Sequence, residues 1–267
     1  MRDAMRYTTI LAFVVGILGC GSNPKPRGDA STEEEVMSAP NWFARGNHLR
    51  ETNKEDAIKA YTEAIRLEPS MEAAFFNRAL TYSELGLDKE AVKDKDSLMI
   101  RKSELAKKLQ GLFGVVVAAN ISMGTSAAEA GNWDLALEKY NVALTYDPKS
   151  SDAHVGRGSV FSQKGKFEDA IAEFDLALES NPRSALAFHN RGRTNFARSQ
   201  FEKAVADFTK AIEVDPNEPS TYKERARAFE SLGQFANAEK DREEASRLEA
   251  KRKGGKSSTS RGTQPEE

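Results

Sequence analysis

The stretch Asp169-Ala-Ile-Ala-Glu-Phe-Asp-Leu-Ala-Leu-Glu-Ser-Asn-Pro182 decides the fold of this chain, because its pattern recurs at a fixed spacing. Clear copies occupy residues 203–216 and 135–148, each 34 residues from the next, and an earlier copy occupies residues 56–69. Two weaker copies begin at Glu90 and Asn237. A fixed period of this length indicates an array of helical hairpins, and it argues against a plain helical bundle.

Small residues repeat in both predicted helices of every copy. The first helix carries a Gly or Ala at six equivalent places: Gly46, Ala79, Gly124, Gly158, Gly192 and Ala226. The second helix carries an alanine at six: Ala57, Ala91, Ala136, Ala170, Ala204 and Ala238. We expect the two backbones to cross closely where these residues meet, so that a larger side chain would overpack the crossing at a cost of about 1–3 kcal/mol.

Aromatic, proline and glycine residues complete the pattern. One turn after the alanine come the rings of Tyr61, Tyr140, Phe174 and Phe208, and three residues before it come Trp133, Phe167, Phe201 and Phe235. The rings are predicted to fill the space between helices. The second helix is predicted to stop before Pro69, Pro148, Pro182 and Pro216, because the residue before proline avoids helical angles. Glycines at 86, 131, 165 and 233 are predicted to turn the chain inside each hairpin.

This pattern resembles the tetratricopeptide repeat, over residues 39–250. The resemblance implies an all-α, right-handed α-solenoid of about six helix-turn-helix repeats. Repeats 1 and 2 would occupy residues 39–105 and repeats 3 to 6 residues 117–250. Residues 106–116 would be an insertion between them, where the superhelix could break.

Three segments depart from the regular pattern. We expect residues 89–110 to form one lengthened helix that ends at Gly111. In the last repeat, Glu239 and Arg242 stand at places that are apolar in complete repeats, and this indicates a polar cap that ends the array. Residues 251–267 are rich in Lys, Gly, Ser and Thr, and we expect a disordered tail.

The amino terminus has the layout of an export signal. Arg2 and Arg6 precede a mostly apolar stretch at residues 7–18, which is too short to span a bilayer. The sequence Ile17-Leu18-Gly19-Cys20 resembles the lipobox of bacterial lipoproteins. The resemblance implies removal of residues 1–19, lipidation of Cys20 and a flexible tether over residues 20–38. An ordinary cleaved signal with an incidental cysteine is the alternative.

The residues do not favour catalysis, a metal site or a cofactor. His48, His154 and His189 lie in different repeats without metal-ligand spacing, and Cys20 is the only cysteine. No phosphate loop, dinucleotide fingerprint or nucleophile motif occurs. The net charge of −2 with interspersed signs is not that of a nucleic-acid-binding face. We therefore expect no nucleic acid and no small-molecule substrate, and a protein or peptide as the partner.

In the tetratricopeptide family the first helices line a concave groove that holds a peptide or helix. Carried onto this sequence, the groove comprises Phe43, Asn47, Phe76, Asn77, Leu80, Val155, Ser159, His189, Asn190, Arg193, Lys223 and Arg227. Asn77 and Asn190 hold equivalent places, and an amide can donate to and accept from a peptide backbone. Surface asparagines that bond only water are the alternative.

The family's clamp for chaperone tails is matched only in part. Asn47 and Asn77 fit it, but Phe43 stands where a lysine is needed. The resulting expectation is an adaptor that is lipid-anchored in a bacterial envelope, with its body in the periplasm and with the outer membrane favoured. A cytosolic scaffold or co-chaperone with a spurious signal, and an enzyme with a site between repeats, are the alternatives.

Overall fold

The structure is a computed structural model that describes residues 37–257, with side chains described to residue 252. The predicted signal, Cys20 and residues 258–267 lie outside the described residues. Within them every regular element is an α-helix. The helices are α2 (Ala39–Leu49), α3 (Lys54–Leu67), α4 (Glu72–Glu84), α5 (Asp88–Ile100), α6 (Glu104–Glu129), α7 (Trp133–Tyr146), α8 (Ser151–Gln163), α9 (Phe167–Ser180), α10 (Ala185–Ala197), α11 (Phe201–Val214), α12 (Pro219–Ser231) and α13 (Phe235–Ser257).

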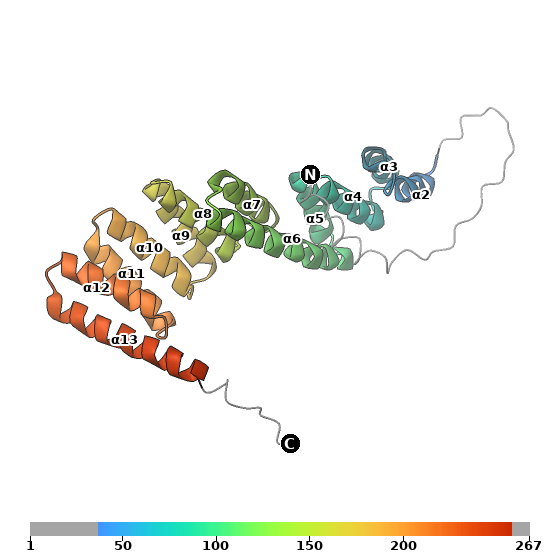
Figure 1. The fold of residues 1–267 in the computed structure, drawn as a ribbon. Coiled ribbons are helices and arrows are strands. Elements are labelled where there is room, and N and C mark those ends of the chain that lie inside the picture. The colour runs from blue at the N-terminus through green and yellow to red at the C-terminus, as the bar shows by residue number, and fades with distance from the viewer. Residues whose placement is uncertain (1–36, 258–267) are drawn as a thin grey trace, which may run out of the picture. The chain divides into compact units, whose positions relative to one another are not determined.

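The chain forms two compact units, of which the first ends at Val117 and the second begins at Ala118, within α6. In the first unit α2 packs on α3, α3 on α4, and α4 on α5. In the second, the hairpins α8–α9, α10–α11 and α12–α13 follow one another, and each packs on the next (Figure 1). The predicted all-α solenoid of helix-turn-helix repeats is confirmed.

The helix ends that were predicted from proline and glycine residues are confirmed. Four second helices end two residues before Pro69, Pro148, Pro182 and Pro216. Gly86, Gly131, Gly165 and Gly233 all have φ between 71° and 75°, in the left-handed region that favours glycine. Repeat 5 makes the same turn with Ser199 at φ 59°. There the amides of Ser199 and Gln200 donate to the carbonyls of Phe196 and Asn195, which closes the helix end as in the glycine-containing turns.

The predicted single helix over residues 89–110 is wrong. The chain leaves α5 at Ile100, and α6 begins at Glu104. Lys102 takes φ 56°, and the amides of Lys102 and Ser103 donate to the carbonyls of Met99 and Leu98. This pair of bonds ends a helix even without glycine. Gly111 lies inside α6, where glycine costs about 1 kcal/mol relative to alanine but does not end the helix.

The predicted insertion, residues 106–116, is the first part of α6. Ala106, Leu109, Phe113 and Val116 are buried at helical spacing. Among the described residues, α6 alone is long and apolar enough to cross a membrane by length and composition, and a third of its most apolar stretch is buried. A core helix passes the same test, so this feature alone assigns no membrane span.

The small residues of the first helices face aromatic rings. A Cβ atom at Gly46, Gly124, Gly158 or Gly192 would lie 2.5–2.8 Å from a ring carbon of Tyr61, Tyr140, Phe174 or Phe208, respectively. The atoms nearest to these glycines belong to the rings, and the six second-helix alanines that we expected at the crossing are fully buried. Repeats 2 and 6 carry Lys95 and Arg242 in place of the ring, and there the small residue is alanine.

The carboxyl end of the array is longer than predicted, because α13 continues through residues 251–257. Ala245 and Leu248 are buried, and they pack in one cluster with Tyr222 of α12. Nη2 of Arg252 donates to the carbonyl of Asn217 at 2.7 Å and to Glu218 at 3.1 Å. The segment predicted as a tail therefore begins as a helix, and Arg252 bonds it to the loop between α11 and α12. Glu239 and Arg242 are exposed on α13, as a polar cap requires.

Candidate interaction surface on the first helices

In the first compact unit, hydrogen bonds join the first helices α2 and α4. Oδ1 of Asn47 accepts from Nδ2 of Asn77 at 2.7 Å and from the Tyr61 hydroxyl at 2.9 Å. Burial raises the pKa of Tyr61 to about 12, so this hydroxyl stays a donor at physiological pH. Both lone pairs of the Asn47 oxygen are then occupied, and the exposed Asn47 can offer a ligand only its N–H groups.

In the second compact unit the first helices are joined in the same manner. Nδ2 of Asn190 donates to Oγ of Ser159 at 3.1 Å, which links α10 to α8. One turn on, the hydroxyls of Ser162 and Thr194 lie 3.0 Å apart. His189 continues the contact to α12, where its Nδ1 lies 3.0 Å from Oγ1 of Thr221.

A hollow of about 300 Å³ lies between α8 and α10. It is lined by Ser159, Ser162, Gln163, Phe167, Phe174, Asn190, Arg193 and Ala197. Its lining combines amide, hydroxyl and guanidinium groups with two rings, and it includes no acidic side chain. Such a hollow can take one side chain of an extended segment, while the neighbouring amides bond to that segment's backbone.

Ten of the twelve predicted groove residues are exposed or half-buried on first helices, but Leu80 and Val155 are 1% and 4% exposed. Val155 packs with Ala170, Phe174 and Ala187 in the core. The predicted place of Leu80 and Val155 on the exposed face of the groove is therefore wrong. Lys223 and Arg227 are exposed, but each pairs with a nearby carboxylate, Glu249 and Glu224 respectively.

A row of half-buried ion pairs joins the helices of four repeats, and the sequence did not predict it. In repeats 2, 5 and 6 an arginine beside the small residue binds an aspartate of its own second helix: Arg78 with Asp94, Arg191 with Asp207 and Arg225 with Asp241. In repeat 4 Arg157 binds Glu173. Each arginine also bonds to the preceding second helix, at Thr62, Asp175, Thr209 and Asn141. Each arginine lies 16 residues after its partner on the preceding second helix and 16 residues before its partner on its own second helix. This constant spacing is the sequence signal that could have predicted both contacts.

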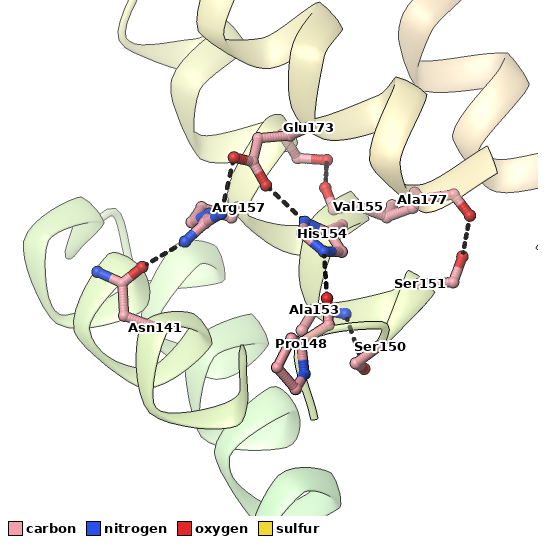
Figure 2. A network of polar contacts seen from close by, with 11 residues as sticks. Asn141, Pro148, Ser150, Ser151, Ala153, His154, Val155, Arg157, Glu173 and Ala177 are labelled. Carbon is pink, nitrogen blue, oxygen red and sulfur yellow. Dashed lines mark hydrogen bonds and ion pairs between the residues drawn. The ribbon is translucent and has the colours of Figure 1, made fainter. Parts of the chain in front are cut away.

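His154 belongs to this network and to the core. Its Nδ1 lies 2.8 Å from Oε2 of Glu173, and its Nε2 lies 3.1 Å from the carbonyl of Pro148 (Figure 2). Glu173 thus bridges Arg157 and His154. The predicted core or edge position of His154 is confirmed, because the residue is 5% exposed.

His189 is expected to make the stability of the second compact unit depend on pH. Burial, and then the nearby charge of Arg193, lower the pKa of His189 below its ordinary 6.5, while Glu224 and Glu218 oppose this. Below about pH 6.5 the unfolded chain binds a proton at this histidine that the folded chain resists. The folded state should therefore lose stability as the pH falls from about 6.5 toward the lower folded pKa.

We expect His189→Gln to reduce the fall in melting temperature between pH 7 and pH 5, measured by circular dichroism. Arg193→Gln removes the second cause and should reduce it less. An unchanged fall in His189→Gln would contradict this assignment.

The described residues were also compared with the arrangement that a metal ion needs. Between residues 37 and 257, no group of three or more His, Cys, Asp or Glu side chains is placed to hold a metal ion.

Comparison with protein families decides the assignment. A model described as "Tetratricopeptide repeat" matches residues 47–103 and 121–185, and a second model of the same description matches residues 185–218. Together they cover more than half of the chain. The chain belongs to the tetratricopeptide-repeat family.

Two relatives of this tetratricopeptide-repeat (TPR) chain carry descriptive names. It is 38% identical to human "Small glutamine-rich tetratricopeptide repeat-containing protein beta" over 65 residues. That match covers 24% of this chain and 21% of the relative. It is also 32% identical to "Hsp70-Hsp90 organizing protein 1" of Glycine max over 109 residues. That match covers 40% of this chain and 17% of the relative. The chain thus spans less than a third of the length of these relatives.

Among solved structures, the TPR chain is similar to MamA 41-end from Desulfovibrio magneticus RS-1. The identity is 14% and the TM-score 0.43, with coverage of 80% of this chain and 96% of MamA. It is also similar to the first TPR domain of human RPAP3, at 24% identity and a TM-score of 0.43, with coverage of 46% and 96%. Scores this low add nothing to the family assignment.

Proposed function

We propose that this TPR chain is an envelope adaptor that holds an extended segment of a partner protein against its first helices. The observation that carries the proposal is the linked polar face of those helices. Asn77 and Asn190 stand at equivalent places and bond across to Asn47 and Ser159 on the neighbouring first helix. Fixed in this way, they offer their remaining amide groups without loss of side-chain freedom on binding.

The hollow beside Asn190 supports the same function. A backbone segment that bonds to Asn190 would place one of its side chains near Ser159, Arg193 and Phe167. Main-chain bonds then supply sequence-independent affinity, and the hollow supplies selectivity. This division suits a scaffold, because it needs neither a cofactor nor a catalytic group.

The anchoring part of the proposal rests on the sequence. Gly19-Cys20 follows a short apolar stretch as in bacterial lipoproteins, and acylation at Cys20 by more than one chain would give stable attachment. Residues 20–38 would then separate the lipid from the repeats. The body would face the periplasm, and the absence of aspartate after Cys20 favours the outer membrane.

Affinity capture from detergent-solubilised native membranes tests the proposal. We expect a stoichiometric partner to accompany the full-length protein and to be lost from the Asn77→Ala/Asn190→Ala variant. The control is Asn217→Ala/Asn237→Ala, which removes two exposed asparagines outside the first helices and should retain the partner. If the Asn77→Ala/Asn190→Ala variant still captures the partner, the first-helix groove is not the binding face.

A cytosolic co-chaperone is the second candidate function. The names of the Hsp70-Hsp90 organizing relatives favour it, and Asn47 with Asn77 fits part of the family's clamp. Phe43 in the place of the required lysine argues against it. Mass measurement of the mature chain separates the two: a lipidated amino terminus at Cys20 supports the envelope adaptor, whereas intact residues 1–19 in a soluble fraction support the co-chaperone.

A further inference from the structure

Arg193 differs from the other cations on the first helices of the second compact unit. Arg157, Arg191, Lys223, Arg225 and Arg227 each form an ion pair. Within residues 37–252, Arg193 forms none, although it is exposed and lines the hollow between α8 and α10.

The equivalent arginine of repeat 6 shows what Arg193 lacks. Arg227 stands 34 residues later and pairs at 2.9 Å with Glu224, three residues before it on the same helix. Its guanidinium also lies over the Phe196 ring, 5.1 Å from the centroid. Three residues before Arg193 stands Asn190, an amide without charge. Repeat 6 neutralises this arginine internally and repeat 5 does not.

The surroundings of Arg193 are those of an anion site. The hollow includes no acidic side chain, and the amides of Gln163 and Asn190 keep N–H groups that can donate to a ligand. The Ser159 and Ser162 hydroxyls donate within the protein, to the carbonyl of Val155 and to Oγ1 of Thr194. His189 nearby has its pKa lowered by burial and by Arg193, so it adds no fixed charge at neutral pH. The positive charge at the hollow is therefore left for a ligand to neutralise.

We propose that this hollow binds the carboxylate of an Asp or Glu side chain within the partner segment, with Arg193 as its counter-charge and Asn190 beside it. The inference rests on the proposed function and names the partner's chemistry. A guanidinium forms two parallel hydrogen bonds with a carboxylate, and these fix the ligand's orientation. The first-helix face continues past the hollow to Lys223 and Arg227 on α12, so a bound segment passes over the hollow and presents a side chain, not its terminus.

Binding of the fluorescently labelled full chain to an array of short random-sequence peptides tests the proposal. The peptides are attached through their carboxyl ends, which removes the terminal carboxylate, and each has a copy with Asn and Gln in place of Asp and Glu. We expect the unmodified chain to bind peptides with Asp or Glu about 10- to 100-fold more tightly than their neutral copies, as for a hydrogen-bonded charge.

Three variants locate the effect. Arg193→Glu should lose the acidic preference and gain affinity for copies with Lys in place of Asp and Glu, a gain that an unfolded protein would not show. Asn190→Glu copies the arrangement of repeat 6 and should lose the preference by pairing Arg193 internally. Arg183→Glu changes an exposed arginine before α10 and outside the hollow, and it should retain the preference.

The outcomes separate this inference from the proposed function. Peptide binding with no preference for Asp or Glu, or a preference retained by Arg193→Glu, overturns the inference and leaves the adaptor intact. A preference that appears only for peptides with a free terminus also overturns it. The absence of any peptide binding by the unmodified chain counts against both.

Discussion

Replacing Phe174 by alanine is expected to lower the free energy of unfolding of the second compact unit by about 3–5 kcal/mol. Phe174 is fully buried in α9 and packs with Val155, Ala170, Ala177 and Ala187. Its ring also lies against Gly158, whose missing Cβ makes room for it. The helices can close the resulting gap only in part, because fixed backbone borders the cavity. Urea unfolding followed by circular dichroism would measure the loss.

Phe235 provides the matched control for that experiment. It is also a phenylalanine of a second helix, but it is 69% exposed at the start of α13. Phe235→Ala should change stability by less than about 0.5 kcal/mol, as for an ordinary surface substitution. Equal losses at the two positions would contradict the role of the Phe174 ring in holding repeat 4 together.

Phe174 and Gly158 show what the sequence could predict of the packing. The period found both residues and assigned them to facing helices, because a small residue recurs in all six repeats and a ring in four of them. The period does not say which residue of one helix meets which residue of the other. That choice depends on how each side chain leans along its own helix, and in the structure the ring of Phe174 supplies the atom nearest to a Cβ at Gly158.

The sequence predicted a helix end only where a proline or a glycine marks it. Glycine turns and proline stops were found, whereas Lys102 and Ser199 adopt the same left-handed turn without glycine. Their conformation is set by two hydrogen bonds in each turn, from one amide to the carbonyl three residues back and from the next amide to the carbonyl five residues back, and these bonds have no residue-type signature. The extension of α13 was hidden in the same way, because Arg252 contacts a loop 35 residues before it.

The sequence predicted which helices carry the candidate site, but it did not predict how deeply each residue is buried. A residue on the correct helix can still lie at the edge of the core, as Leu80 and Val155 do. The distinction between Arg193 and Arg227 was also beyond the sequence pattern, because both are arginines at the same place in the repeat. It follows from Glu224, one turn before Arg227, and from Asn190, one turn before Arg193. Lipidation of Cys20 stays a prediction.

The arginine row explains how successive repeats are held in register. Arg191 reaches Asp207 of its own hairpin and Asp175 of the preceding one, so a single side chain ties three helices. Asp207 is 6% exposed and also accepts from Asn195 at 2.9 Å. Apolar contacts alone allow neighbouring helices to slide, whereas a guanidinium with fixed donor directions does not.

Asp207→Ala is therefore expected to lower the free energy of unfolding by about 3 kcal/mol, at the lower end of the cost of leaving a buried charge unpaired. The lower end applies because the Arg191 side chain keeps 24% of its surface in solvent and still has Asp175 as a partner. Asp175→Ala removes the half-exposed partner of the same arginine and should cost less than about 1 kcal/mol. Thermal or urea unfolding of the two variants, at equal salt, gives the comparison.

The double variant Arg191→Met/Asp207→Leu separates the charge from the packing. If the loss in Asp207→Ala comes from an uncompensated guanidinium, removal of both charges should recover most of it, because an apolar pair of similar volume needs no partner. If the double variant is as unstable as Asp207→Ala, the loss comes from the cavity and from the amide of Asn195 that Asp207 leaves unpaired. In that case the register of repeats 4 and 5 depends on shape, and the arginine row adds little to it.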